Sequence, residues 1–124
     1  MLNGAKVAVA IAVKDLSTAK EFYGDTLGLN LAEETPAGAW YETNGTRLLV
    51  YPSGFAGTNK ATYAGFGVED VEGAVTDLKA KGVQFQTFDM PGVTWDGEIA
   101  SFGETEKSAW FTDPDGNILA LGNM

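Results

Sequence analysis

VAVAIAVKDLSTAKEFYGDTLGLNL, residues 7–31, and TYAGFGVEDVEGAVTDLKAKGVQFQ, residues 62–86, share one order of elements. Each stretch reads as an apolar strand, a Val-x-Asp step, an amphipathic helix, a glycine and a further strand. Asp15 and Asp70 stand where the N-caps of the two helices are expected, and a glycine follows each helix where a positive φ is needed. The sequence therefore predicts two copies of one structural unit.

Short strands joined by turns are expected after each helix. After the first helix they are expected at 30–34, 39–43 and 46–52. After the second helix they are expected at 83–89, 108–113 and 117–123. Asn44-Gly45 is a strong hairpin signal, whereas 91–103 is poorly regular, with Asp96-Gly97 as a candidate hairpin tip.

These elements predict an α+β fold made of two βαβββ modules with mostly antiparallel sheets. The modules are expected at about residues 1–52 and 61–124, joined by a linker at 53–60 within a single domain. The closing stretch, 110–121, contains the tight turn Asp113-Pro114-Asp115-Gly116 and a small residue, Ala120, among large apolar ones.

Composition excludes several kinds of chemistry. The 124 residues include no cysteine and no histidine, which removes disulfides, thiolate nucleophiles, imidazole catalysis and the commonest ligands of zinc, copper and iron. The 8 basic and 17 acidic residues give a net charge of −9, so nucleic acid and anionic membranes are repelled and cations attracted. The longest apolar run, 7–13, is too short to cross a bilayer, and no signal-peptide pattern is present, so a cytoplasmic location is expected.

Strand alternation gives the first strand of each module a bulky face and a small face. The bulky faces carry Val7, Val9, Ile11 and Val13, and Thr62, Ala64, Phe66 and Val68. The small faces carry Ala8, Ala10 and Ala12, and Tyr63, Gly65 and Gly67. We expect the helix to cover each bulky face. The small faces either pack closely on another element or subunit, or line a cavity that admits a ligand, and Ala120 belongs with them.

VKDLSTAKEFYGDTLGL (13–29) and FTDPDGNILAL (111–121) resemble the opening and closing motifs of the vicinal oxygen chelate superfamily, which includes glyoxalase I, extradiol dioxygenases and bleomycin-resistance proteins. With the internal repeat, the resemblance covers nearly the whole chain. It implies paired βαβββ modules whose open sheets curl around a central cleft, often in a homodimer. The linker permits pairing within one chain or exchange between two chains.

Enzymes of this superfamily place metal ligands on the pocket-facing side of particular strands. By the resemblance, Ala8 and Tyr63 stand where many members have histidine, and Leu49 and Ala120 stand near positions that carry carboxylates. A divalent cation needs several oxygen, nitrogen or sulfur donors that converge on it. We therefore expect no metal, no other cofactor, and none of the usual metal-dependent glyoxalase, dioxygenase or epimerase activities.

Aromatic and small side chains are then the expected ligand contacts. Tyr63 is favoured because both its alternation and its alignment point inward, and Tyr51 shares a face with Leu49. Arg47 has the same parity, and it either orients an anionic or carbonyl group or ends a strand in solvent. The tryptophans and Phe102 lie in segments of unknown register, with core or dimer packing as the alternative. The complete set of expected contacts is Ala8, Trp40, Arg47, Leu49, Tyr51, Tyr63, Trp95, Phe102, Trp110 and Ala120.

These features favour a metal-independent protein that sequesters or carries a small organic molecule, such as an antibiotic or metabolite of aromatic or cationic character. The first alternative is a metal-free isomerase or lyase that uses Tyr63 or a loop carboxylate as acid–base group. The candidate carboxylates are Glu42, Asp96, Glu98 and Glu104. The second alternative is a non-catalytic interaction module whose concave face is closed by a partner chain.

Overall fold

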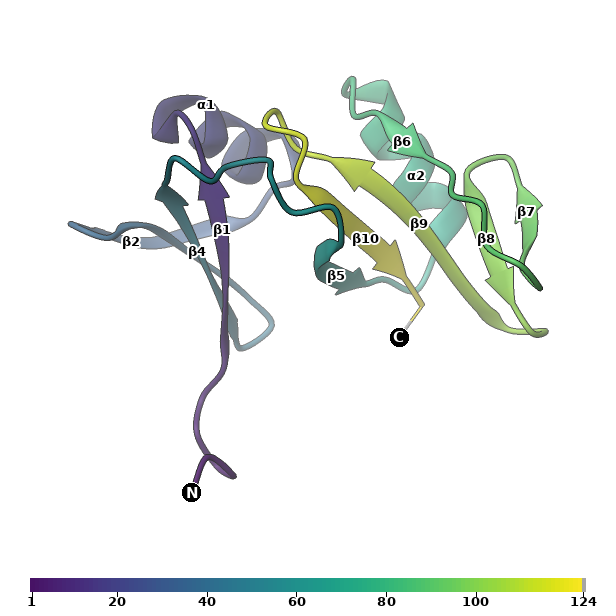
Figure 1. The fold of residues 1–124 in the computed structure, drawn as a ribbon, viewed down its shortest axis with the longest axis horizontal. Helices are drawn as coiled ribbons and strands as arrows, with labels where there is room; N and C mark the ends of the chain where they lie inside the picture. The colour runs from purple at the N-terminus through teal and green to yellow at the C-terminus, as the bar shows by residue number, and fades with distance from the viewer. Residues whose placement is uncertain (124) are drawn as a thin grey trace. The chain divides into compact units, whose positions relative to one another are not determined.

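The computed structural model describes residues 1–123, which fall into two compact units divided between Thr58 and Asn59. The division lies inside the segment 53–60. Each unit contains one mostly antiparallel sheet and one helical segment (Figure 1). The mixed α+β class expected from the sequence is confirmed.

Unit 1 follows the βαβββ plan. Its elements are β1 (Ala8–Val13), α1 (Leu16–Lys20), η1 (Glu21–Thr26), β2 (Asn30–Thr35), β3 (Gly38–Thr43) and β4 (Thr46–Pro52). The strand order is β1-β4-β3-β2, with β1 parallel to β4 and the other pairs antiparallel. Asn44 and Gly45 have φ values of 47° and 82°, which is the left-handed geometry that a two-residue hairpin requires.

The first helix begins where its cap predicts but changes type before it ends. The Asp15 carboxylate accepts hydrogen bonds from the Ser17 backbone N–H at 3.1 Å and the Thr18 hydroxyl at 2.8 Å. From Glu21 onward the helix is a π-helix, in which the Leu27 N–H donates to the Phe22 carbonyl at 2.9 Å. This wider turn was not expected from the sequence, and such segments occur frequently at functional sites.

Unit 2 repeats the plan with an addition. Its elements are β5 (Thr62–Gly67), α2 (Val71–Ala80), β6 (Phe85–Gln86), β7 (Thr94–Asp96), β8 (Ile99–Phe102), β9 (Glu106–Thr112) and β10 (Ile118–Gly122). The strand order is β5-β10-β9-β8-β7, and β6 also pairs with β9 (Figure 1). Asp70 caps α2 by accepting a hydrogen bond from the Gly73 N–H at 3.0 Å.

One expectation for the second module was wrong and another was confirmed. The strand expected at 83–89 contains only Phe85–Gln86. The poorly regular stretch 91–103 contains the β7–β8 hairpin, which turns after Asp96 as the candidate tip at Asp96-Gly97 predicted. The short β6 has a structural cause, because β6 and β8 share the same edge of β9. β6 pairs opposite Trp110 and Phe111, while β8 occupies the half of β9 that begins at Glu106.

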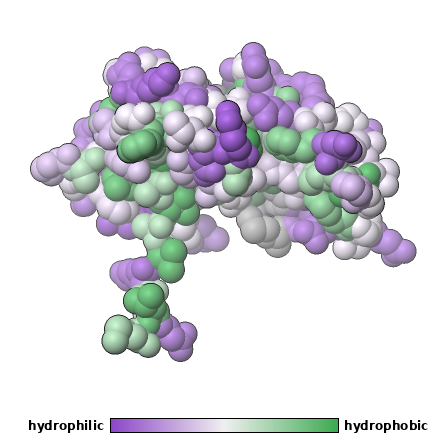
Figure 2. Space-filling view, viewed as in Figure 1, coloured by the Kyte–Doolittle hydropathy of each residue, from purple (hydrophilic) through white to green (hydrophobic). Residues whose placement is uncertain are grey.

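The expected bulky faces form the cores only in part: Ile11 and Val13 are fully buried, whereas Ala64, Phe66 and Val68 are half-buried and Thr62 is exposed. In unit 1 the helix side buries Ile11, Val13, Tyr23, Tyr41 and Val50. In unit 2 it buries Val71, Val75, Phe111, Leu119 and Leu121. Val7 was expected in this layer, but it precedes β1 and is 82% exposed, together with the apolar residues Met1 and Leu2 (Figure 2). No helix in the described part of the chain is long and apolar enough to span a bilayer.

The turn between β9 and β10 is held by a buried polar network. Asp113 Oδ1 accepts from the backbone N–H groups of Asp115 and Asn117 at 2.9 Å each, and Oδ2 accepts from Asn117 Nδ2 at 2.8 Å. Asp113 is 5% exposed and Asn117 is fully buried. The network satisfies the polar groups that the turn removes from water, so β9 and β10 are joined in a defined register.

Candidate functional site

The face of the second sheet that lies opposite α2 is built mainly from small residues. Residues paired across neighbouring strands point to the same side of a sheet, so the register identifies the rows. One row contains Gln86, Trp110, Ala120 and Gly65. The next row contains Trp95, Ala100, Ser108, Gly122 and Gly67. Ala120 therefore lies on the small-residue face, between an indole and a glycine.

Four aromatic side chains gather on this face, and we call them the aromatic cluster: Phe88, Trp95, Phe102 and Trp110. Trp110 is at the centre, with ring centroids 5.6 Å from Phe88, 6.0 Å from Trp95 and 6.3 Å from Phe102. All four rings are half-buried. The inserted β7–β8 hairpin supplies Trp95 and Phe102, so the segment that looked irregular in sequence carries half of the cluster.

Tyr63 lies at an irregularity of the same sheet. Thr62 pairs with Ile118 and Ala64 pairs with Leu119, so Tyr63 is the extra residue of a β-bulge. Its side chain is half-buried, and among residues 1–123 it makes no ring contact with the aromatic cluster. The structure therefore brings together Trp95, Phe102 and Trp110, but it places Tyr63 outside that group.

The corresponding face of the first sheet joins the other expected contacts. Its rows are Ala8 with Arg47 and Glu42, Ala10 with Leu49, Trp40 and Glu33, and Ala12 with Tyr51. Ala8 and Ala10 are exposed, whereas Ala12 is 2% exposed. Trp40, whose register the sequence left open, shares this face with Leu49 and Arg47 because β3 pairs with β4.

Arg47 is held on this face by two neighbours. Its guanidinium carbon lies 4.6 Å above the centroid of the Trp40 ring, and Nη2 lies 3.4 Å from Glu33 Oε1. Its Nε is buried and has no hydrogen-bond partner among the described residues. Arg47 is thus a stacked, oriented donor instead of a freely solvated strand end.

At the positions where the sequence resemblance implies metal ligands, the side chains do not fit a metal ion. Ala8, Leu49 and Ala120 end in carbon, and Tyr63 offers a single phenol oxygen. Among residues 1–123, no group of three or more histidine, cysteine, aspartate or glutamate side chains is placed to hold a metal ion. These positions therefore contribute space and apolar surface, without the convergent donors that a cation requires.

Glu98, a candidate general base, is engaged elsewhere. Its Oε1 accepts a hydrogen bond from Lys79 Nζ at 2.6 Å, and this bond holds the pKa of Glu98 below its usual value. A carboxylate that acts as a base near neutral pH needs the opposite shift. The geometry therefore disfavours Glu98 as an acid–base group.

The ion pair between Lys79 and Glu98 should make the stability of the protein depend on pH. Lys79→Met is expected to raise the pKa of Glu98 toward 4.5, which a carbon-13 NMR titration of the carboxyl group measures. Because the folded-state pKa is lowered, the pair contributes stability above about pH 4.5 that is lost as the pH falls further. The unfolding free energy of the variant should therefore vary less with pH in acid. Lys107→Met, which removes the partner of Glu72, is the control and should leave Glu98 unchanged.

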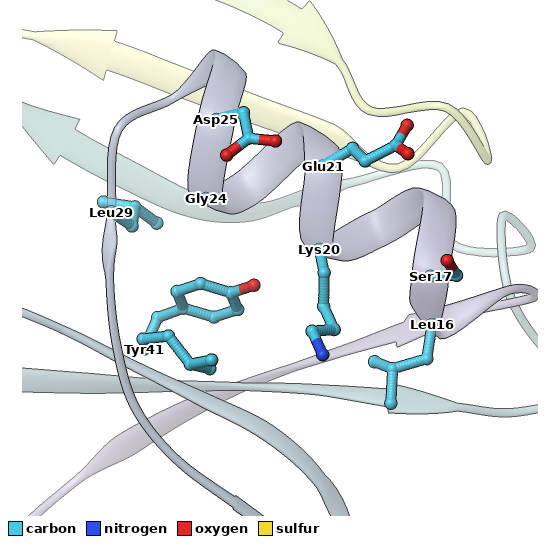
Figure 3. Close-up of a pocket in the computed structure, with 9 residues that line it drawn as sticks. Leu16, Ser17, Lys20, Glu21, Gly24, Asp25, Leu29 and Tyr41 are labelled. Atoms are coloured by element: carbon cyan, nitrogen blue, oxygen red, sulfur yellow. The ribbon is translucent and has the colours of Figure 1, made fainter.

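Sequence reasoning missed a hollow on the helix-covered side of unit 1. It has a volume of about 590 Å³ and lies between the α1–η1 helix and strands β2 and β3 (Figure 3). The only sequence signal for it was Gly24, a glycine within the helix. The hollow depends on the π-helical turn, which no local sequence pattern predicted.

A family model described as Glyoxalase/Bleomycin resistance protein/Dioxygenase superfamily matches residues 7–121. The uncharacterised protein YetH of Bacillus subtilis (strain 168) is 28% identical over 127 residues, covering 91% of this chain and 92% of YetH. TnmS3, an antibiotic binding protein from Streptomyces sp. CB03234, is 23% identical with a TM-score of 0.67 and covers 95% of each chain. Lactoylglutathione lyase from Agrobacterium tumefaciens is 17% identical with a TM-score of 0.72, covering 96% of this chain and 93% of the lyase.

At these identities the structural likeness establishes the fold, and this fold is shared by a binding protein and an enzyme. The family model spans nearly the whole chain and both repeats. The chain belongs to the glyoxalase/bleomycin resistance protein/dioxygenase superfamily.

Proposed function

We propose that the protein binds a small, planar aromatic molecule without a metal ion, in order to sequester or carry it. The observation that carries this proposal is the aromatic cluster on the small-residue face of the second sheet. Half-buried indole and phenyl rings offer large apolar area at low entropic cost, and Ala120 and Gly65 leave space beside Trp110. The likeness to an antibiotic binding protein supports the same class of function.

The net charge of the protein limits the charge of the ligand. The chain has a net charge of −9, which favours an uncharged or cationic aromatic molecule over an anion. On the first sheet, considered by itself, the stacked Arg47 is a donor suited to a carbonyl oxygen. Chelator should leave binding intact, because the positions that hold metal in related enzymes carry no donor set here.

The proposal is tested by two matched substitutions on opposite faces of one sheet. Phe102 lies in the aromatic cluster, whereas Phe85 packs on Phe111 on the helix-covered side, with ring centroids 5.6 Å apart. With proflavine as a planar cationic probe, Phe102→Leu is expected to weaken binding about fivefold, because one stacking ring contributes ~1 kcal/mol. Phe85→Leu should leave the affinity unchanged. Fluorescence titration at about 0.15 M salt reduces non-specific attraction by the protein's charge.

Equal losses in both variants, or no saturable binding of any planar aromatic in a screen, would contradict the proposal. Native mass spectrometry of the purified full-length chain adds an independent measurement, since it detects a retained organic ligand. It also counts subunits, for which we expect a homodimer. Turnover that survives chelator but is lost in Tyr63→Phe would instead favour a metal-free enzyme.

A further inference from the structure

The hollow in unit 1 has an apolar floor and an irregular helical wall. Leu29, Leu31 and the Tyr41 ring form the floor, and Leu31 keeps 45% of its surface exposed. The π-helical turn places Gly24 above Tyr41, where the glycine contributes no side chain. The hollow, at about 590 Å³, is within the range of small-molecule sites.

The base of the hollow contains the hydroxyl group of Tyr41. Tyr41 is 2% exposed as a whole residue, and it lines the hollow. Figure 3 shows the Tyr41 ring lying beneath the helix with its hydroxyl directed to the Lys20 side of the hollow. Burial raises the pKa of the Tyr41 phenol, so it is the neutral, hydrogen-bonding form that faces the hollow. A hydroxyl that lines the hollow is available to a polar group of a ligand.

The charges around the hollow select the sign of that partner. Lys20 is the basic residue of the rim, and its Nζ is held by Glu34 Oε1 at 2.6 Å. Glu21 and Asp25, one turn apart on the helix, also line the hollow. Because Glu34 already neutralises Lys20, the two helix carboxylates leave a net negative rim.

We propose that this hollow is a second ligand site, which binds an amine with an apolar body. The apolar body lies on Leu29, Leu31 and the Tyr41 ring. The ammonium group is held by the carboxylates of Glu21 and Asp25, and the Tyr41 hydroxyl accepts one of its hydrogen bonds. All the lining residues belong to unit 1, so the site shares no residue with the aromatic cluster and does not depend on the function proposed for that cluster.

The test compares two probes that share a body and differ in charge, 2-phenylethylamine and 3-phenylpropionate, by nitrogen-15 NMR on the intact protein. The amine is expected to shift the amides of Gly24, Leu29 and Leu31, and the carboxylate is not. Asp25→Asn is expected to weaken amine binding about tenfold, which corresponds to one charge-assisted contact. Asp77→Asn, which removes an exposed charge from α2 in unit 2, is the matched control and should have no effect.

Gly24→Ala is a second variant that tests the site if Asp25→Asn folds poorly. Its methyl group would meet the Tyr41 hydroxyl and ring at 3.7 Å, an ordinary contact, and alanine favours the helix. The variant should therefore fold and lose amine affinity, because the methyl narrows the hollow. Equal shifts with both probes, or wild-type affinity in Gly24→Ala, would overturn the proposal. Amine-induced shifts at Trp110 and Phe102 alone would also overturn it, while leaving the aromatic cluster as the binding site.

Discussion

Gly38→Ala is expected to lower the free energy of unfolding by about 3 kcal/mol, from overpacking and backbone strain together. A Cβ at Gly38 would lie 2.3 Å from the Val50 carbonyl oxygen and 3.0 Å from Tyr51 Cα. These are backbone atoms of β4, so they cannot rotate away as a flexible side chain would. Gly38 also has a φ of 154°, which a residue with a side chain rarely adopts.

Urea denaturation followed by circular dichroism measures this loss, and Gly45→Ala is the matched control. Gly45 also has a positive φ, 82°, but nothing lies within 4 Å of a Cβ placed there. Its substitution should cost only the backbone strain, about 1 kcal/mol. If the two variants are equally destabilised, β3 and β4 do not approach each other at Gly38 as closely as the structure shows. The approach brings Gly38 against Tyr51, which shares a face of the first sheet with Ala12.

Asn117→Asp is expected to cost about 3 kcal/mol at neutral pH, within the range for an uncompensated buried charge. Asn117 Nδ2 donates to Asp113 Oδ2 at 2.8 Å, and both residues are buried. The substitution replaces that donor with a second carboxylate, so the two negative groups can remain adjacent only if one of them binds a proton.

The stability of the Asn117→Asp variant should depend on pH with a distinctive sign. In the folded variant, one carboxyl of the pair has a pKa raised above the value of about 3.9 that aspartate has in an unfolded chain. The folded state then binds more protons than the unfolded state, so stability increases as the pH falls through the raised pKa toward about 3.9. Thermal unfolding measured across this pH range should show the recovery.

Asn44→Asp controls for the change of charge. Asn44 is exposed, at the tip of the β3–β4 hairpin, where Asp-Gly forms the same turn as Asn-Gly. It should be nearly neutral at all pH values. A stability of Asn117→Asp that does not improve on acidification would contradict the buried hydrogen-bonded pair with Asp113.

Local interactions explain why much of the fold could be predicted from the sequence. Asp15 and Asp70 cap their helices, and Gly28 and Gly82 adopt φ values of 76° and 88°, because these preferences depend on neighbouring residues only. The expectation for the strand at 83–89 failed for a non-local reason. Whether those residues extend as a strand depends on which segment pairs with the edge of β9, and the β7–β8 hairpin occupies half of that edge.

The sequence by itself determined the repeated module, the caps, the turns, the small faces and the lack of donors at Ala8, Leu49 and Ala120, since each follows from residue type and short-range periodicity. Tertiary structure alone decided that Trp95 and Phe102 meet Trp110, that Arg47 stacks on Trp40, and that a hollow forms around the Tyr41 hydroxyl. These features depend on strand register and on the π-helical turn, which result from long-range pairing and packing. The strand pairing determines which side chains are neighbours across a sheet. The neighbours of Trp110 therefore could not be predicted from the residues next to it in the sequence.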